Sequence, residues 1–216
     1  KLDLGIRYDG YAQSVYLRDR QNIDNQYRDY RNNFTTAFAY HHTIHPHTEV
    51  MINSGFVWRS PAIHELNSQG LHQGVSSIEE GNMGLRPEKS FKTSFSIQTD
   101  FNDKLFLEGL CYFHNINDYI YLKPENQLRL TIRGAFPVFT YRQTHAQIMG
   151  FELNTKYEWS TDGLLYLHYQ YLRGWDHTEN IPLVWMPPNM LRGGSKIHLP
   201  NFLASKSANL EIEGRY

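Results

Sequence analysis

Hydrophobic and polar residues alternate along most of this chain. Residues 91–98 are "FKTSFSIQ", residues 151–159 are "FELNTKYEW", and residues 165–171 are "LYLHYQY". A period of two places every second side chain on the same face of an extended strand, so each of these segments has one apolar and one polar face. Helical spacing is nowhere sustained. The pattern therefore predicts an all-β chain.

The predicted strands and their connections follow a regular order. The alternation places strands at 1–9, 33–43, 48–60, 86–99, 104–121, 137–159, 164–175, 189–199 and 206–216. Short connections at 44–47, 100–103, 160–163 and 200–205 alternate with long ones at 10–32, 61–85, 122–136 and 176–188. In an up-and-down antiparallel sheet this order puts all long connections at one end. Outer-membrane barrels have this arrangement, with short periplasmic turns and long external loops, so we predict an antiparallel transmembrane β-barrel.

The alternation also predicts which face meets lipid. A Lys or Arg on the lipid face at mid-depth costs about 2–4 kcal/mol, so the charged face must line a wet or protein-filled lumen. The residues expected to face lipid are Leu165, Leu167, Tyr169, Leu210 and Ile212. Those expected to face the lumen are Glu152, Lys156, Glu211 and Glu213. Because a soluble antiparallel sandwich shows the same alternation, an extracellular glycan-binding β-sandwich is the alternative, and a β-rich hydrolase is a third.

Composition narrows the function classes. The chain has 21 Lys and Arg against 22 Asp and Glu, a net charge of -1, so nothing favours nucleic-acid binding. Its single Cys excludes an internal disulfide and a multi-cysteine metal site. No apolar stretch reaches the roughly 18 residues of a transmembrane helix. Since the predicted strands cannot close without leaving two edges, we expect residues 1–216 to be a fragment of a barrel domain, with the plug and closing strands outside it.

Five segments carry a family resemblance. They are "GFVWRSPAIHEL" (55–66), "EEGNMGLRPEKS" (79–90), "YFHNINDYIYL" (112–122), "GAFPVFTYRQTHAQIMGFELNTKYEW" (134–159) and "PLVWMPPNMLRGG" (182–194). In this order they resemble TonB-dependent outer-membrane receptors. The first looks like the family's strand-end motif and the second like its Gly-Asn-x-x-Leu-(Lys/Arg)-Pro-Glu motif. The motif residues, expected to be structural, are Arg59, Pro61, Glu65, Asn82, Leu85, Pro87 and Glu88.

The resemblance has consequences for fold and function. It implies a barrel of about 22 strands, of which this chain forms the middle-to-late part. It implies a location in the Gram-negative outer membrane and TonB-energised import of a scarce nutrient, such as a ferric siderophore, haem or another metal chelate. The implied partners are TonB, the nutrient and outer-membrane lipid, with no cofactor and no covalent chemistry. The family's plug and TonB box have no counterpart in this sequence, so their residues cannot be carried over.

Elementary chemistry gives these motif residues roles at the strand ends. Pro61 lacks a backbone donor and is expected to end sheet pairing where the strand leaves the membrane. Pro87 is expected to start the next strand from a turn-rich loop. Arg59 and Glu65 are expected to pair near the rim and to hold the 61–85 loop.

Two histidines in this external loop, His64 and His72, are the candidate ligand-binding and metal-binding residues. A neutral imidazole is a good ligand for iron and zinc, and one axial nitrogen is enough to hold a haem. In the resembled family, haem receptors carry a haem-binding histidine in this interval and zinc receptors have a similar Gly-x-His run. Gly70, Gly74 and Gly81 are expected to let the loop fold over a ligand and open again. The alternative is a polar loop that contains two histidines by chance.

Overall fold

A computed structural model describes residues 1–18, 24–102, 104–200 and 207–216 of the chain. The described residues form long strands and one short helix. Their bounds are β1 Leu2–Arg18, β2 Asp24–His45, β3 Thr48–Arg59, α1 Ile63–Asn67, β4 Gln69–His72, β5 Ser77–Glu80, β6 Glu88–Phe101, β7 Leu105–Thr131, β8 Gly134–Ser160, β9 Gly163–Asp176, β10 Ile181–Pro182, β11 Met190–Pro200 and β12 Ser207–Arg215. Within these ranges, no helix has the length and apolar character to cross a membrane.

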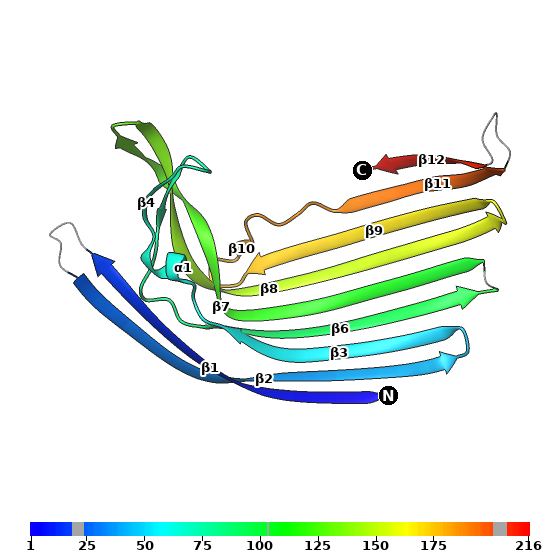
Figure 1. Cartoon of the computed structure of the whole chain (residues 1–216), viewed down its shortest axis with the longest axis horizontal. Coiled ribbons are helices and arrows are strands. Elements are labelled where there is room, and N and C mark those ends of the chain that lie inside the picture. The colour runs from blue at the N-terminus through cyan, green and yellow to red at the C-terminus, as the bar shows by residue number, and fades with distance from the viewer. Residues whose placement is uncertain (19–23, 103, 201–206) are drawn as a thin grey trace.

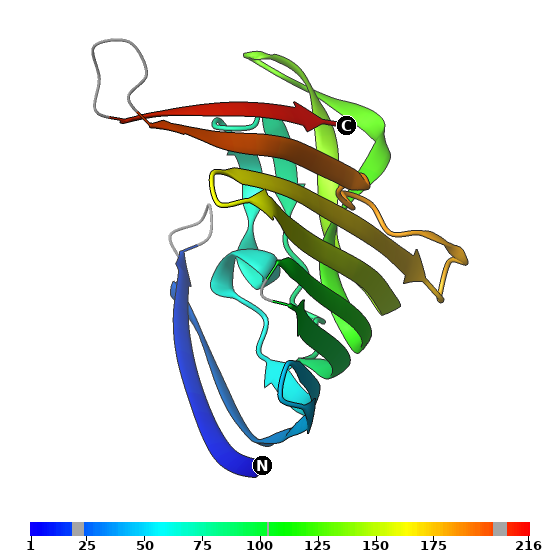
Figure 2. The ribbon, with the colours of Figure 1, turned by 90° about the vertical axis from the view of Figure 1, so that its right-hand side faces the viewer.

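The strands form one continuous sheet. Its main path runs β1-β2-β3-β6-β7-β8-β9-β11-β12, and each strand on this path is antiparallel to its neighbours. Figures 1 and 2 show that the sheet curves like a section of a barrel wall, with β1 and β12 as the edges of the described part. This confirms the predicted up-and-down order. The described strands do not divide into two facing sheets, so the β-sandwich alternative is wrong.

The two ends of the sheet differ as predicted. The connections that follow β2, β6 and β8 are short and lie at one end, whereas α1, β4, β5 and β10 lie at the other (Figure 1). The remaining predicted short connection, 200–205, lies almost entirely outside the described residues. The end that carries α1 is therefore the one expected to be extracellular.

Two of the predicted long loops are wrong, because the strands continue through them. β1 and β2 pair from Leu2↔Tyr40 to Arg18↔Asp24, so residues 10–18 and 24–32 of the predicted 10–32 loop are strand. β7 and β8 pair up to Thr131 and Gly134, with register shifts at Ile116/Tyr119 and Pro124/Leu128. The second of these shifts follows Pro124, so the strand accommodates this proline next to a β-bulge.

The part of β7 and β8 beyond the first bulge, residues 119–144, forms a distal hairpin with different neighbours on its two faces. One face joins a cluster of buried or half-buried residues consisting of Leu66, Leu85, Ile120 and Tyr141. The second cluster, where this hairpin meets the sheet, consists of Ile116, Tyr119, Ala146, Ile148, Leu183 and Met186. The two external connections, 60–87 and 177–189, are therefore packed against this hairpin and do not hang free.

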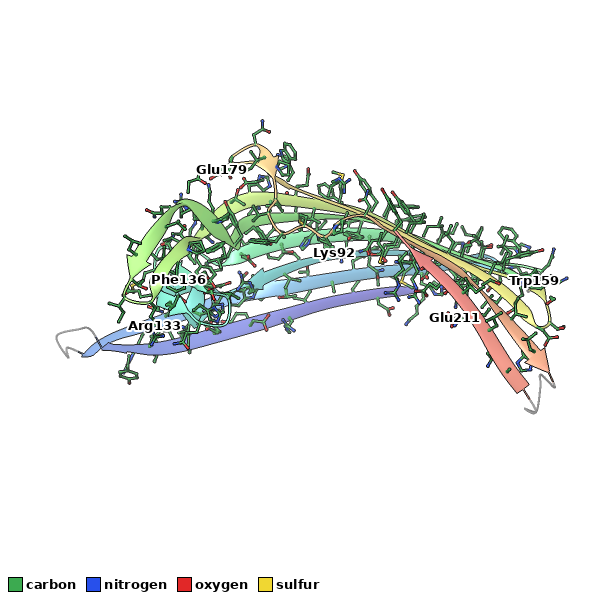
Figure 3. The ribbon with its side chains drawn as sticks, turned by 90° about the horizontal axis from the view of Figure 1, so that it is seen from above. Lys92, Arg133, Phe136, Trp159, Glu179 and Glu211 are labelled. Atoms are coloured by element: carbon green, nitrogen blue, oxygen red, sulfur yellow. The ribbon has the colours of Figure 1, made fainter. Side chains whose placement is uncertain are left out.

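The pairing register separates the two faces of the barrel wall. Leu165, Leu167 and Tyr169 share one face of β9, while Tyr166 lies on the other. The Tyr166 hydroxyl is within hydrogen-bonding distance of Glu211 (3.0 Å) and Glu213 (2.8 Å), which places these carboxylates on the polar face. Figure 3 shows side chains standing out from both surfaces of the arched sheet.

We predict that the apolar face of β9 and β12 contacts lipid in the complete barrel. Spin labels at Leu165, Leu167 and Ile212 should be accessible to oxygen and protected from a polar nickel reagent. Labels at Glu152 and Glu211 serve as the matched lumenal controls and should show the reverse. Because a slip of one residue would exchange the two faces, the opposite accessibility pattern would refute the assignment.

Candidate functional site

Three charged residues join the two receptor-like motifs at the external strand ends. Arg59, the last residue of β3, donates from Nε to Glu88 (2.7 Å) and from Nη1 to Glu65 (2.8 Å). The side chains of Glu65 and Glu88 are only 10% and 12% exposed. Hydrogen bonding to Glu88 and then to Glu65 raises the pKa of Arg59, although burial opposes it. The predicted Arg59–Glu65 pair is present, and Glu88 extends it into a rim clamp of Arg59, Glu65 and Glu88.

The carboxylates of the rim clamp also hold backbone groups. Glu65 accepts a hydrogen bond from the Ala62 amide (2.6 Å), which fixes the start of α1 in the manner of half a capping box. Glu88 accepts one from the Ile120 amide (2.6 Å) in β7. Each carboxylate thus connects Arg59 to a different element, so the clamp ties the 60–87 segment to both β3 and β7.

The other motif residues pack and cap the same segment. Pro61 is less than 2% exposed and Leu85 is 3% exposed. The Asn82 amide donates to the Glu65 carbonyl (2.8 Å), which joins the second motif to α1. Pro87 directly precedes β6, where the sequence predicted a strand start. These contacts are structural, and they position the loop residues between the two motifs.

Both predicted histidines line one surface cavity of about 450 Å³. His72, at the end of β4, lies with Nδ1 2.8 Å from Oε1 of Glu79 in β5. His64, in α1, meets Tyr141 edge-on with 5.8 Å between ring centroids. The remaining lining residues are Ser68, Gln69, Gly70 and Leu71. We call this cavity the histidine pocket.

A short hairpin positions this pocket. β4 pairs with β5, and β5 adds to β8 in parallel, with Ile78 opposite Val138. Ile78 and Val138 are 2% and 1% exposed, so the hairpin is anchored by buried apolar contact. The sequence predicted the whole of 61–85 as a connection without strands, and this parallel pairing is a finding of the structure.

The pocket offers an imidazole, a carboxylate and a phenol. The Glu79 carboxylate orients the His72 ring through Nδ1, which leaves the Nε2 lone pair available to a ligand. Burial, then the negative charges of Glu79 and Glu65, raises the pKa of Tyr141, so its hydroxyl stays a neutral donor. In the part of the chain that the structure describes, no group of three or more His, Cys, Asp and Glu side chains is arranged to hold a metal ion.

Sequence reasoning found the two histidines and missed Glu79 and Tyr141. Glu79 begins the second motif, at "EEGN", and Tyr141 lies in the fourth segment. No spacing rule connects positions so far apart in the sequence. Only the parallel addition of β5 to β8 brings these two residues to the same pocket.

Solved structures share this architecture. The copper transporter OprC has a TM-score of 0.70 and 18% identity, over 99% of this chain and 36% of that chain. A double mutant of the Serratia marcescens hemophore receptor HasR, in complex with its hemophore HasA and heme, has a TM-score of 0.64 and 15% identity, over 98% and 40%. The siderophore receptor PirA from Pseudomonas aeruginosa has a TM-score of 0.61 and 15% identity, over 88% and 36%.

These likenesses establish the fold, and the sequence match establishes the family. The chain spans well under half the length of each of these three proteins. No curated protein matches the sequence. Residues 1–204 match the TonB-dependent receptor-like β-barrel family, whose members are outer-membrane receptors and transporters, so the hydrolase alternative is wrong. The chain belongs to the TonB-dependent receptor β-barrel family.

Proposed function

We propose that the protein containing this chain imports a scarce nutrient across the outer membrane, and that the histidine pocket contacts this nutrient at the external face. The observation that carries the proposal is the convergence of His64 and His72 on one cavity at the external end of the sheet. The rim clamp holds the segment that bears both histidines, so the pocket is part of a fixed surface. An external binding surface of this kind suits the first step of import.

The proposed nutrient is a metal or metal chelate, with haem or zinc ahead of a ferric siderophore. His72 presents Nε2 while Glu79 holds Nδ1, which is the arrangement that a haem iron needs from one axial ligand. Zinc at this place would need further ligands from outside the described residues. The structural neighbours include proteins named for copper, heme and siderophores, which supports this class of nutrient.

The proposal extends to the rest of the protein. We place this chain in the middle-to-late part of a larger barrel whose other strands close the wall and whose plug fills the lumen. TonB, acting through segments outside this chain, would supply the energy. Outer-membrane lipid would cover the apolar face that carries Leu165 and Ile212, both exposed on the isolated wall.

Replacing His72 with alanine in the complete receptor is expected to weaken haem binding and to abolish the absorbance signature of an imidazole-bound haem. The reason is that the other imidazole of the pocket, His64, packs against Tyr141 and has no carboxylate partner among the described residues. Absorbance titration of the purified receptor and uptake assays in whole cells measure the two effects.

The matched control is His198→Ala. His198 lies in β11, where Nδ1 contacts Asn209 at 2.9 Å, and it takes no part in the histidine pocket. This variant should bind and import haem like the unaltered receptor. If His72→Ala leaves the binding and uptake of both haem and zinc unchanged, His72 and this ligand class are removed from the proposal.

A further inference from the structure

Two further histidines lie side by side at the external end of the sheet, apart from the histidine pocket. His145 is in β8 and His177 directly follows β9, and both are exposed. Their ring centroids are 5.3 Å apart and the rings are tilted by 35°. Two imidazoles that bind one ion at about 2.0–2.1 Å per nitrogen have centroids at most roughly 6 Å apart, so the observed spacing is within reach of a shared ion.

The backbone around this pair is held firmly. The His177 amide donates to the His145 carbonyl (2.9 Å), and the His145 amide donates to the Thr178 hydroxyl (3.1 Å). Asp176, only 2% exposed, accepts hydrogen bonds from the amides of Thr178 (2.8 Å) and Glu179 (3.0 Å). The turn that carries His177 is therefore fixed against β8, so binding an ion would require little further ordering of the backbone.

Amide side chains select the ring nitrogen that each histidine presents. Nε2 of His145 is 2.7 Å from Oδ1 of Asn115, and Nε2 of His177 is 3.1 Å from Oε1 of Gln147. A carbonyl oxygen only accepts, so each Nε2 carries the proton and donates it. Each Nδ1 then keeps its lone pair, and within the described residues neither Nδ1 has a hydrogen-bond partner. Metal-binding histidines have this arrangement, in which the second ring nitrogen donates to an orienting acceptor.

We propose that His145 and His177 form a binding site for a divalent transition-metal ion, with one Nδ1 from each ring as ligands. Imidazole favours Cu²⁺, Ni²⁺ and Zn²⁺ over Ca²⁺ and Mg²⁺, which prefer oxygen ligands. Because no cluster of three or more ligating His, Cys, Asp or Glu occurs in the described part of the chain, water fills the other positions and the ion stays exchangeable. The bound ion joins β8 to the 177–189 connection, whatever nutrient the receptor imports.

The test uses the complete receptor in detergent, titrated with Cu²⁺ or Zn²⁺ alone. His145→Ala and His177→Ala should each remove one ion from the calorimetric stoichiometry. The electron paramagnetic resonance spectrum of bound Cu²⁺ should show two coupled nitrogens in the unaltered receptor. Gln147→Leu, which removes the acceptor that orients His177, should weaken binding about 10–100-fold while retaining the site.

The controls separate this site from the histidine pocket. His72→Ala should leave this ion bound, and His145→Ala should leave haem binding intact, so either proposal can fail without the other. The altered residues are exposed, and barrel folding is checked by the faster gel mobility of the unheated receptor. Unchanged stoichiometry and affinity in folded His145→Ala and His177→Ala would overturn the proposal.

Discussion

Replacing Arg59 with methionine is expected to release the 60–87 segment from the strand ends. The change removes the guanidinium that pairs with both Glu65 and Glu88, whose side chains are 10% and 12% exposed. Breaking a buried ion pair from one side costs about 3–5 kcal/mol, and because Arg59 itself is 43% exposed we expect the lower end of this range. The barrel itself stays folded, since the sheet pairing of β3 and β6 does not depend on this side chain.

Hydrogen exchange measures this release locally. The amides of Ala62 and Asn82 are hydrogen-bonded within the segment. If the free energy of local opening falls by about 3 kcal/mol, these amides exchange roughly a hundredfold faster. Arg86→Met is the matched control, because Arg86 has a 73% exposed side chain paired with Asp118. An exposed pair contributes about 0–1 kcal/mol, so little change is expected there. Equal protection in the Arg59 and Arg86 variants would contradict the role given to the rim clamp.

The sequence predicted the barrel wall well because lipid on one side and a wet lumen on the other impose a strict period of two. The long connections were harder to predict, since beyond the membrane no lipid fixes which face of a strand is apolar, so the alternation loses that physical cause. In the distal hairpin, Leu128, Leu130 and Ile132 alternate with polar residues although they are 69%, 83% and 105% exposed. In the structure β7 continues past Pro124, with a shift of register between Pro124 and Leu128.

The candidate site was predictable only in part, because some of its contacts join segments that are distant in the sequence. His64 and His72 were located by the two motifs that bracket them, and the clamp residues by the motifs themselves. Glu79 reaches His72 through the β4–β5 hairpin, and Tyr141 joins them only because β5 pairs with β8 in parallel. Such pairing between distant segments follows from burial of Ile78 against Val138, which no local pattern indicates. The His145–His177 pair was missed likewise, because adjacency across strands appears only once the register is known.

Replacing Gly81 with alanine is expected to separate the second motif from α1. A Cβ at this position would lie 2.6 Å from three backbone atoms, Asn67 N, Leu66 C and Ser68 N, which cannot rotate away as a side chain can. The Gly81 amide also donates to the Ser68 carbonyl (2.7 Å), so the two segments are in direct backbone contact. This close approach gives Gly81 a packing role. Overpacking of this kind costs about 1–3 kcal/mol.

Gly74→Ala is the matched control in the same loop. The nearest atoms to a Cβ there belong to the His72 ring, at 3.7 Å, which is an ordinary van der Waals contact. Both changes restrict the unfolded chain equally, so their difference isolates the backbone clash. We expect the amides of Gly81 and Asn82 to exchange roughly 10–100-fold faster in Gly81→Ala and at nearly the original rate in Gly74→Ala. The added methyl group would push residue 81 away from α1 and so move Asn82 away from Glu65. Gly81→Ala should therefore reproduce part of the Arg59→Met effect with the ion pairs left in place. Unaltered exchange at both amides would show that the 60–87 segment tolerates the added methyl group and that its close packing does not hold the motif in position.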